Sequence, residues 1–266
     1  MLQACQDAAP VAISQEAAMA AYGEGKQVEV RHIPAVRILN DRGNYSASLG
    51  VLAPWMRPLA KQLPWFKMGN AAVKSLAGIA IAAVAQRLAT PVDRVDLLGK
   101  LQDSRDDEGQ PMGREELTAE ALTQLIAGSD TTSNSSCAIT YHLAHNPEVQ
   151  RKLQKELDDA LGNNDDPVSS YEEVKKLPYL QAVIDEALRI HSTSGVGLPR
   201  VVPEGGLTVC GQFFPEGTVL SVPTYTIHRD KHVWGNDVEA FRPERWFEQD
   251  KKLVQNTFNP FSYGPR

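Results

Sequence analysis

Apolar residues recur at helical spacing through much of the chain, so helices are the main predicted elements. An alanine-rich run predicts a helix over residues 70–88, and good helix formers predict another over residues 114–127. Asn146 followed by Pro147 predicts the start of a further helix, because proline is tolerated at the first helical position. Gly162 then marks its end. Helices are therefore expected to dominate the middle of the chain.

The hydrophobic period changes in the second half. Ser170 and Glu173 have the spacing of a capping box, which predicts a short helix, and residues 180–191 carry apolar side chains at helical spacing. Short β-type runs separated by glycine and proline follow, at residues 197–202, 207–210, 213–214 and 218–222. The pattern predicts a mainly α chain with a small β-sheet packed beside it, an α+β fold in one domain.

Other stretches lack such periodicity. Residues 1–50 mix short helical signals with glycine and proline breakers, residues 54–66 form an aromatic connector interrupted by proline, and residues 103–113 predict an exposed loop. Residues 128–136 are poor helix formers whose hydroxyls compete for backbone hydrogen bonds, so propensity predicts a loop there. Past Thr224 the chain is rich in proline, tryptophan and arginine, and it is expected to be irregular.

Composition narrows the class of protein. The chain has 266 residues, 42% of them hydrophobic, so it can bury a sizeable core. Its formal net charge is -6 and no basic stripe is present, which argues against nucleic-acid binding. The longest weakly polar run, residues 76–85, is far shorter than the roughly 20 residues of a membrane-spanning helix, so we expect no span. Residues 1–7 lack the features of a secretory signal.

Cysteine and histidine give little support for metal chemistry. Cys5, Cys137 and Cys210 are an odd number at wide spacing, which argues against a disulfide framework and a zinc site and favours a reducing compartment. His142 and His145 lie three residues apart on a predicted helix, but no carboxylate or third histidine completes a ligand set nearby. We interpret the two histidines as a polar face and a helix end.

The sequence contains several Glu-x-x-Arg pairs, each of which would place a carboxylate and a guanidinium one helical turn apart. Such pairs are usually exposed and contribute roughly a few tenths of a kcal/mol, so none is informative alone. The pairs are Glu148/Arg151, Glu186/Arg189 and Glu239/Arg242.

The second of these pairs stands in an ordered series of motifs. Its helix reads Glu-Ala-Leu-Arg and is followed by the β-type runs, then by Phe-Arg-Pro-Glu-Arg-Trp at residues 241–246 and by Phe-Asn-Pro-Phe-Ser-Tyr-Gly-Pro-Arg at residues 258–266. Ala-Gly-Ser-Asp-Thr-Thr at residues 127–132 precedes them. In this order the four motifs resemble signatures of the cytochrome P-450 family. The resemblance implies that residues 1–266 are a partial domain with that family's mainly helical α+β fold, in incomplete form.

The resemblance implies haem b as the cofactor and replaces the loop predicted at residues 128–136 by a helix that is locally widened beside the haem. Ala127 and Gly128 would then lie against the cofactor. Asp130 and Thr131 would be the catalytic residues, because a hydroxyl and a carboxylate there can relay protons to dioxygen.

Further roles follow from the same resemblance. Glu186, Arg189 and Arg245 would form a buried structural triad that fixes the segment carrying the iron ligand. Arg200 and Arg266 occupy positions similar to those that bind the haem propionates, a task that suits guanidinium groups. The other residues assigned to the cofactor are His228, at the same edge of the haem, and Phe261, in the last motif.

The sequence departs from the family pattern at its end. The family's haem loop continues after the arginine with one residue and then the cysteine whose thiolate is the axial iron ligand, whereas this chain ends at Arg266. Cys5, Cys137 and Cys210 stand in other contexts, so no metal ligand is assigned. About half of the family's usual chain, including its N-terminal membrane anchor, has no counterpart here. We therefore expect this stretch by itself to be inactive.

The resemblance implies a haem-thiolate monooxygenase that receives electrons from an NADPH-dependent cytochrome P-450 reductase. The full-length parent would lie on the cytosolic face of the endoplasmic reticulum membrane and contact the membrane through its N-terminal part. Residues 195–206 are similar to those of fungal benzoate 4-monooxygenases, which implies para-hydroxylation of a benzoate-like aromatic acid, with Val196, Gly197 and Leu198 lining the substrate pocket. The alternative is a non-catalytic, truncated pseudoenzyme or helical fragment whose only activity is binding.

Overall fold

The computed structural model describes residues 10–12, 30–32, 35–90, 93, 95–162 and 168–264. The chain divides into two compact units, Met1–Ser129 and Asp130–Arg266, and the boundary falls inside a single helix, α7 (Arg114–His145). Within each unit the elements pack against one another. The interpretation of the whole chain as one domain stays a prediction.

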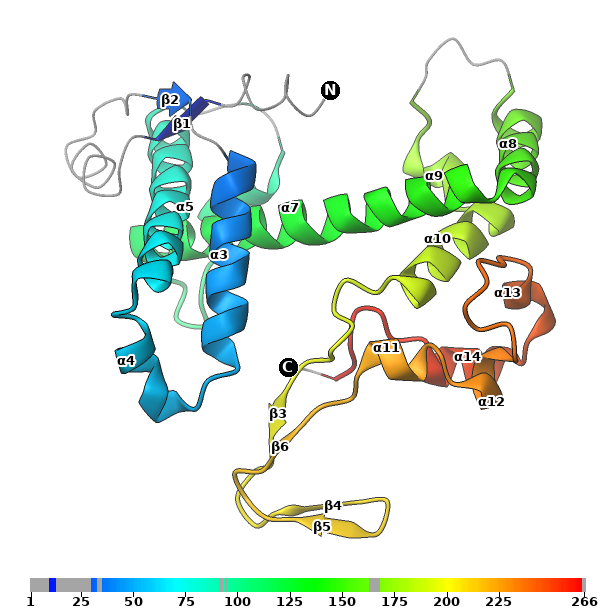
Figure 1. The fold of residues 1–266 in the computed structure, drawn as a ribbon. Coiled ribbons are helices and arrows are strands. Elements are labelled where there is room, and N and C mark those ends of the chain that lie inside the picture. The colour runs from blue at the N-terminus through cyan, green and yellow to red at the C-terminus, as the bar shows by residue number, and fades with distance from the viewer. Residues whose placement is uncertain are drawn as a thin grey trace. The chain divides into compact units, whose positions relative to one another are not determined.

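The first unit is mainly helical (Figure 1). The long helices α3 (Ala35–Gly50) and α5 (Pro64–Ala89) pack against each other where the ring of Tyr45 meets the ring of Phe66 edge-on, with 5.8 Å between centroids. Gly69 is needed at this contact, because a Cβ there would lie 2.2 Å from the Cβ of Tyr45. The remaining elements of the unit are β1 (Pro10–Ala12), β2 (Val30–His32), η1 (Pro54–Met56), α4 (Arg57–Ala60), α6 (Leu97–Asp103) and the first half of α7.

Helix α5 begins earlier than predicted. Residues 54–66 were expected to be a connector and the helix to start near residue 70, but Pro64 occupies the first turn of α5 and the helix has 26 residues. A proline at this position has no N–H to leave unpaired, and its fixed φ angle already suits a helix. The proline that suggested a break is therefore the residue that begins the helix.

The extra length of α5 also corrects the expectation about membrane spans. Phe66–Ala89 is long and apolar enough to cross a membrane, with a mean hydropathy of 1.5 in its most apolar window, of which 39% is buried. The expectation from residues 76–85 was wrong on length because the helix continues on both sides of that run. One such helix is weak evidence for a span, since core helices of soluble proteins have the same composition.

In the second unit, helices α8 (Pro147–Leu161) and α10 (Pro178–Ile190) pack around a core of Val149, Leu153, Val183 and Ala187. Both helices begin at a proline, as the sequence predicted for α8. Asn146 precedes α8, but its side chain donates to the carbonyl of His142 at 2.8 Å and does not cap the helix.

The predicted capping box is confirmed at α9 (Tyr171–Val174). The carboxylate of Glu173 accepts hydrogen bonds from the backbone N–H and the hydroxyl of Ser170, at 2.9 and 2.7 Å. Helix α10 is capped from a neighbouring helix, because Glu156 of α8 accepts the backbone N–H groups of Tyr179 and Leu180 at 2.9 and 2.8 Å. These contacts fix the start of the helix that carries Glu186.

The β-type runs form two antiparallel pairs, not one sheet. The strands β3 (Arg200–Val201) and β6 (Val219–Leu220) pair with Arg200 opposite Leu220, and β4 (Leu207–Val209) pairs with β5 (Gln212–Phe214). The structure thus confirms the fold class, mainly helical with small antiparallel sheets.

The chain past Thr224 is not irregular as predicted. It contains short helices, of which α12 and α14 begin at aspartates whose side chains accept backbone N–H groups: Asp230 from His232, and Asp250 from Lys252 and Leu253. Caps of this kind stabilise helices too short to show a hydrophobic period. The helices are α11 (Thr224–Ile227), α12 (Lys231–Trp234), α13 (Arg245–Glu248) and α14 (Lys251–Thr257).

Helix α7 continues without interruption through residues 128–136, where propensity predicted a loop. The loop is therefore wrong and the helix implied by the family resemblance is right. Serine hydroxyls in this segment donate to carbonyls of the preceding turn, from Ser129 to Leu125 at 2.7 Å and from Ser136 to Thr132 at 2.8 Å. Used in this way, the hydroxyls do not compete with the helix. The local widening stays a prediction.

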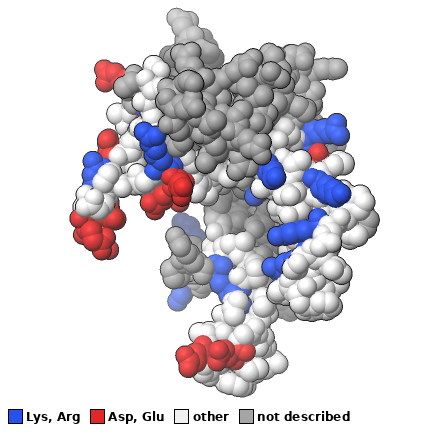
Figure 2. All heavy atoms as spheres, turned by 90° about the vertical axis from the view of Figure 1, so that its left-hand side faces the viewer, with Lys and Arg blue, Asp and Glu red and all other residues white. Residues whose placement is uncertain are grey.

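Charged side chains are distributed in small groups on the face shown in Figure 2. Lys and Arg lie in several separate groups among uncharged surface, and one acidic group lies over the hairpin of β4 and β5.

Candidate functional site

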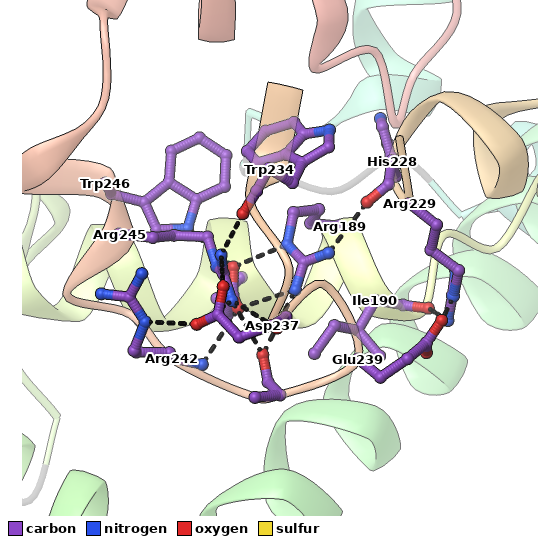
Figure 3. Close-up of polar contacts among 12 residues, drawn as sticks. Arg189, Ile190, His228, Arg229, Trp234, Asp237, Glu239, Arg242, Arg245 and Trp246 are labelled. Carbon is purple, nitrogen blue, oxygen red and sulfur yellow. Dashed lines mark hydrogen bonds and ion pairs between the residues drawn. The ribbon is translucent and has the colours of Figure 1, made fainter. Parts of the chain in front are cut away.

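The structure brings Glu186, Arg189 and Arg245 together in a fully buried cluster (Figure 3). Helix α10 presents Glu186 and Arg189 on one face, and both nitrogens Nε and Nη2 of Arg189 donate to the carboxylate at 2.8 Å. Arg245 comes from the start of α13 and donates from Nε to Glu186 Oε1 at 2.9 Å. The exposed fraction of all three residues is 0%. The amphipathic period of α10 explains the burial of Glu186 and Arg189, since both lie among its apolar positions.

The carboxylate of Glu186 accepts two further hydrogen bonds. The backbone N–H of Arg242 donates to Oε1 at 3.0 Å, and the indole N–H of Trp246 donates to Oε2 at 3.1 Å. A buried carboxylate is costly unless its lone pairs are satisfied. Five donors around one carboxylate meet that requirement, so the cluster is a stable part of the interior.

The two guanidinium groups also hold the segment between α11 and α13. Arg189 donates from Nη1 to the carbonyl of His228 at 2.8 Å. Arg245 donates to the carbonyls of Trp234, Asp237 and Ala240 at 2.7, 3.0 and 3.1 Å. Arginine suits this task because its donors point in fixed directions within one plane. The cluster therefore fixes a stretch of chain that has little regular structure of its own.

Asp237 lies at the edge of the cluster, with its side chain 42% exposed, and was not predicted from the sequence. Its carboxylate accepts from Arg245 Nη1 at 3.2 Å and from Arg242 Nε at 2.7 Å. Together with Glu186, Asp237 thus supplies two negative charges for the two positive charges of Arg189 and Arg245. The hydrogen bond from Arg242, and then that from Arg245, lowers the pKa of Asp237. No periodicity marks this residue, because it lies in a turn.

The two other Glu-x-x-Arg pairs differ from the cluster. Glu148 and Arg151 pair on α8, but their side chains are 76% and 66% exposed. The third pair does not form: Arg242 binds Asp237 and Glu248, and Glu239 binds Arg229 at 3.2 Å. Residues 239–242 are not helical, so the spacing that would place the two side chains on one face has no effect there.

A pocket of about 610 Å³ lies in the same unit, next to the β3–β6 pair. Arg200, Gly197 and Leu198 line it, together with apolar side chains such as Ile227. Gly197 has φ +73° and lies so close to the carbonyl of Val222 that a Cβ would come within 2.2 Å of its oxygen, so the position needs glycine. The pocket combines apolar side chains and the guanidinium of Arg200 with uncharged polar groups such as those of Ser221 and Asn256.

Comparison with known proteins decides the family. The profile of the cytochrome P-450 family matches residues 29–266, most of the chain. The chain belongs to the cytochrome P-450 family. The order of the motifs had indicated this, and the helix through residues 128–136 agrees with it.

Several fungal members of the cytochrome P-450 family are similar to this chain. Benzoate 4-monooxygenase bphA of Aspergillus niger is 52% identical over 244 residues, which cover 88% of this chain and 47% of the relative. Pisatin demethylase of Fusarium vanettenii is 46% identical over 138 residues, 52% of this chain and 26% of the relative. A cytochrome P-450 monooxygenase of Aspergillus terreus is 41% identical over 155 residues, 56% and 31% of the two chains. The chain thus spans about half the length of the first relative.

Membership of the cytochrome P-450 family implies haem, and the pocket beside Arg200 fits one part of that group. The guanidinium of Arg200 suits a propionate, and the apolar part of the lining, which includes Leu198 and Leu220, suits the porphyrin ring. Among the described residues no cysteine lines the pocket: Cys137 is exposed on α7 and Cys210 is exposed in the turn between β4 and β5. Cys5 and Arg266 lie outside the described residues.

Four other predicted site residues lie on α7. Ala127, Gly128, Asp130 and Thr131 follow one another on α7, and all four are exposed. Asp130 and Thr131 belong to the same unit as the pocket but are not among its described lining residues.

Two further predicted residues, Val196 and Phe261, are 83% and 82% exposed. Neither is among the described residues that line the pocket. The structure thus brings Arg200, Gly197 and Leu198 to one pocket and leaves Val196 and Phe261 on the surface.

His228 was predicted to lie at the edge of the haem, but the structure buries it completely beside the cluster. Its ring packs against Trp234 and Phe258, with centroids 6.2 and 5.3 Å apart. Burial, reinforced by the positive charge of Arg189, lowers the pKa of His228 to about 4. A neutral ring in this position is part of the interior, and the place of His228 at the edge of the haem stays a prediction.

Proposed function

We propose that this chain is part of a haem-dependent monooxygenase that inserts one oxygen atom from dioxygen into a small organic substrate. The match of residues 29–266 to the cytochrome P-450 family carries this proposal, and the buried Glu186 cluster supports it. Electrons come from NADPH through a cytochrome P-450 reductase, and the protein acts at the cytosolic face of the endoplasmic reticulum membrane.

Haem b, when bound, supplies the iron at which dioxygen is activated. Arg200 and Arg266 would bind its propionates, and Ala127 and Gly128 would allow α7 to approach the ring. The hydroxyl of Thr131 and the carboxylate of Asp130 move protons to the place where dioxygen is reduced. The Glu186 cluster would not contact the haem itself. It fixes the segment between α11 and α13 and, through that segment, the position of the chain that follows α13.

The proposed substrate is a small aromatic acid such as benzoate, hydroxylated at the para position. Support comes from the 52% identity to benzoate 4-monooxygenase bphA over 244 residues and from the small apolar surface of Gly197 and Leu198. An apolar slot cannot hold a carboxylate alone, because an unpaired buried charge is too costly, so a cationic or polar partner must bind it. Anchored in this way, the ring would offer the carbon farthest from the carboxylate for oxidation, which would give para selectivity by geometry.

The substrate is tested by adding benzoate to a full-length protein that carries this sequence and recording the haem spectrum. We expect benzoate to displace the water bound to the iron and 4-hydroxybenzoate to be the product. A clear spectral shift with a fatty acid or a sterol, and none with benzoate or its ring-substituted relatives, would exclude this substrate class and leave the monooxygenase reaction in place.

The proton relay is tested by Thr131→Ala in the same protein. We expect reducing equivalents to be diverted into peroxide while haem content stays unchanged, because the hydroxyl that positions the proton is lost and the haem contacts are not. Asp130→Asn is expected to slow turnover. Thr132→Ala, one residue further along the helix, is the matched control. Unchanged coupling of NADPH consumption to product in Thr131→Ala would remove Thr131 from the relay.

A further inference from the structure

His228 connects three parts of the second unit. Its backbone N–H donates to the carbonyl of Thr224 at 2.8 Å and ends α11, and its carbonyl accepts from Arg189 of the buried cluster at 2.8 Å. Its ring faces the segment after α14, where Nε2 lies 3.0 Å from the backbone nitrogen of Asn259. One buried residue thus links the cluster to the chain that leads into the last motif.

The partner of the ring determines its protonation state. A backbone N–H can only donate, so Nε2 of His228 must act as the acceptor and carry no proton. The neutral ring then carries its proton on Nδ1, which is buried and has no hydrogen-bond partner among the described residues. The charged groups that face it are the guanidinium groups of Arg189, from α10, and Arg229, at the end of α11, and both oppose a positive charge on the ring. Geometry and charge therefore favour the same neutral form.

Asn259 begins a tight turn that forms part of the pocket wall. Its carbonyl accepts from the backbone N–H of Ser262 at 2.9 Å, and Ser262 has φ +69°, which is unusual for a residue with a side chain. Asn259, Ser262 and Tyr263 all line the pocket that contains Arg200. Pro260, inside the turn, is buried and has no N–H of its own. The bond to His228 is the side-chain contact that holds the first residue of this turn in place.

We propose that His228 is a positioning residue, whose neutral imidazole accepts the Asn259 N–H and so holds the Asn259–Ser262 turn against the wall of the Arg200 pocket. Its importance for catalysis rests on the proposed function, because the turn belongs to the motif that the cytochrome P-450 family uses around haem. The hydrogen bond itself does not depend on that function.

The decisive measurement is hydrogen exchange at the Asn259 amide in a full-length protein that carries this sequence, with overlapping peptides across residues 255–264. His228→Phe keeps an aromatic ring against Trp234 and Phe258 and removes the acceptor, so we expect exchange at Asn259 to become roughly tenfold faster. His228→Gln keeps an acceptor at about the position of Nε2 and is expected to restore most of the protection. His232→Phe is the control, because His232 is 96% exposed.

The unmodified protein gives a second test, in which the effect is measured without any substitution. Protection of Asn259, corrected for the intrinsic exchange rate, is expected to fall as the pH drops through the pKa of His228, about 4, because the protonated ring can no longer accept. A peptide from α10 serves as the internal reference for global unfolding. His228→Gln, which has no titrating ring, is expected to show no such fall.

The outcomes separate this role from the proposed function. Unchanged exchange at Asn259 in His228→Phe, equally fast exchange in the Phe and Gln variants, or protection in the unmodified protein that is independent of pH would each overturn the assignment. A protein that neither binds haem nor hydroxylates benzoate, but in which protection of Asn259 depends on His228, would defeat the proposed function and leave the positioning role standing.

Discussion

Helices α8 and α10 carry the same Glu-x-x-Arg spacing and use it in opposite ways. On α8, Glu148 and Arg151 pair in solvent, with side chains 76% and 66% exposed. On α10, Glu186 and Arg189 pair at 0% exposure, and their remaining donors and acceptors bind chain that lies 39 to 60 residues away. Water already satisfies the first pair, whereas only protein groups satisfy the second. The same local motif is therefore expected to contribute little to the free energy of unfolding on α8 and much on α10.

The largest difference is expected from removing the carboxylate of each pair. Glu186→Ala leaves two buried guanidinium groups without their carboxylate and is expected to lower the free energy of unfolding by about 3–5 kcal/mol and to prevent stable haem binding. The measurement is denaturant unfolding, together with haem content, in the full-length protein. Equal stability of Glu186→Ala and Glu148→Ala would contradict the comparison.

A smaller loss of stability is expected when Arg245 is replaced by a residue that keeps its positive charge but not the geometry of its hydrogen bonds. Arg245→Lys retains the positive charge but cannot reach Glu186, Trp234 and Ala240 together, so we expect a loss of about 2 kcal/mol. Thermal unfolding would measure it. Arg151→Lys on α8 is the matched control and should leave the transition unchanged; a loss of the same size there would show that lysine itself, and not the lost geometry, is responsible.

Acid adds to the comparison, because Asp237 contacts the buried Arg245 from a partly exposed position, 42% exposed, and has a lowered pKa. A carboxyl group with a lowered folded-state pKa stabilises the protein above its unfolded value, 3.8, and loses that contribution as the pH falls through the folded value. Asp237→Asn is therefore expected to be less stable than the unmodified protein at neutral pH and to lose less on acidification below about pH 4. Parallel pH profiles of the two proteins would rule out this contribution.

The smallest effect is expected on α8. Glu148→Ala should change the free energy of unfolding by less than about 0.5 kcal/mol, because exposed pairs one helical turn apart contribute little and salt screens them. Unfolding curves at low and high ionic strength would measure the change. A loss above about 1 kcal/mol that persists in high salt would show that α8 packs against something that buries this face.

Much of the fold could be predicted where local signals are strong. The capping box at Ser170 and Glu173, the proline start of α8 and its end at Gly162 follow from residues that interact within one turn. Local signals failed at Pro64, read as a break although it starts α5, and in the short helices past Thr224, whose caps and tertiary contacts replace a hydrophobic period. The hydroxyls of residues 128–136 misled propensity because they can bond either to a loop or back to their own helix.

By itself the sequence determined the family, because the order and spacing of motifs are properties of the chain. The resemblance to that family then implied the choice of Glu186 and Arg189 over the two other pairs, and their partner Arg245. Only the tertiary structure decided that Asp237 balances the cluster, that Arg242 leaves Glu239 for Asp237, and that His228 lies inside and holds Asn259. These facts depend on burial and on contacts across tens of residues. The energy of a charged or hydrogen-bonding group depends on the water it loses and the partners it gains on folding, and its neighbours along the chain determine neither.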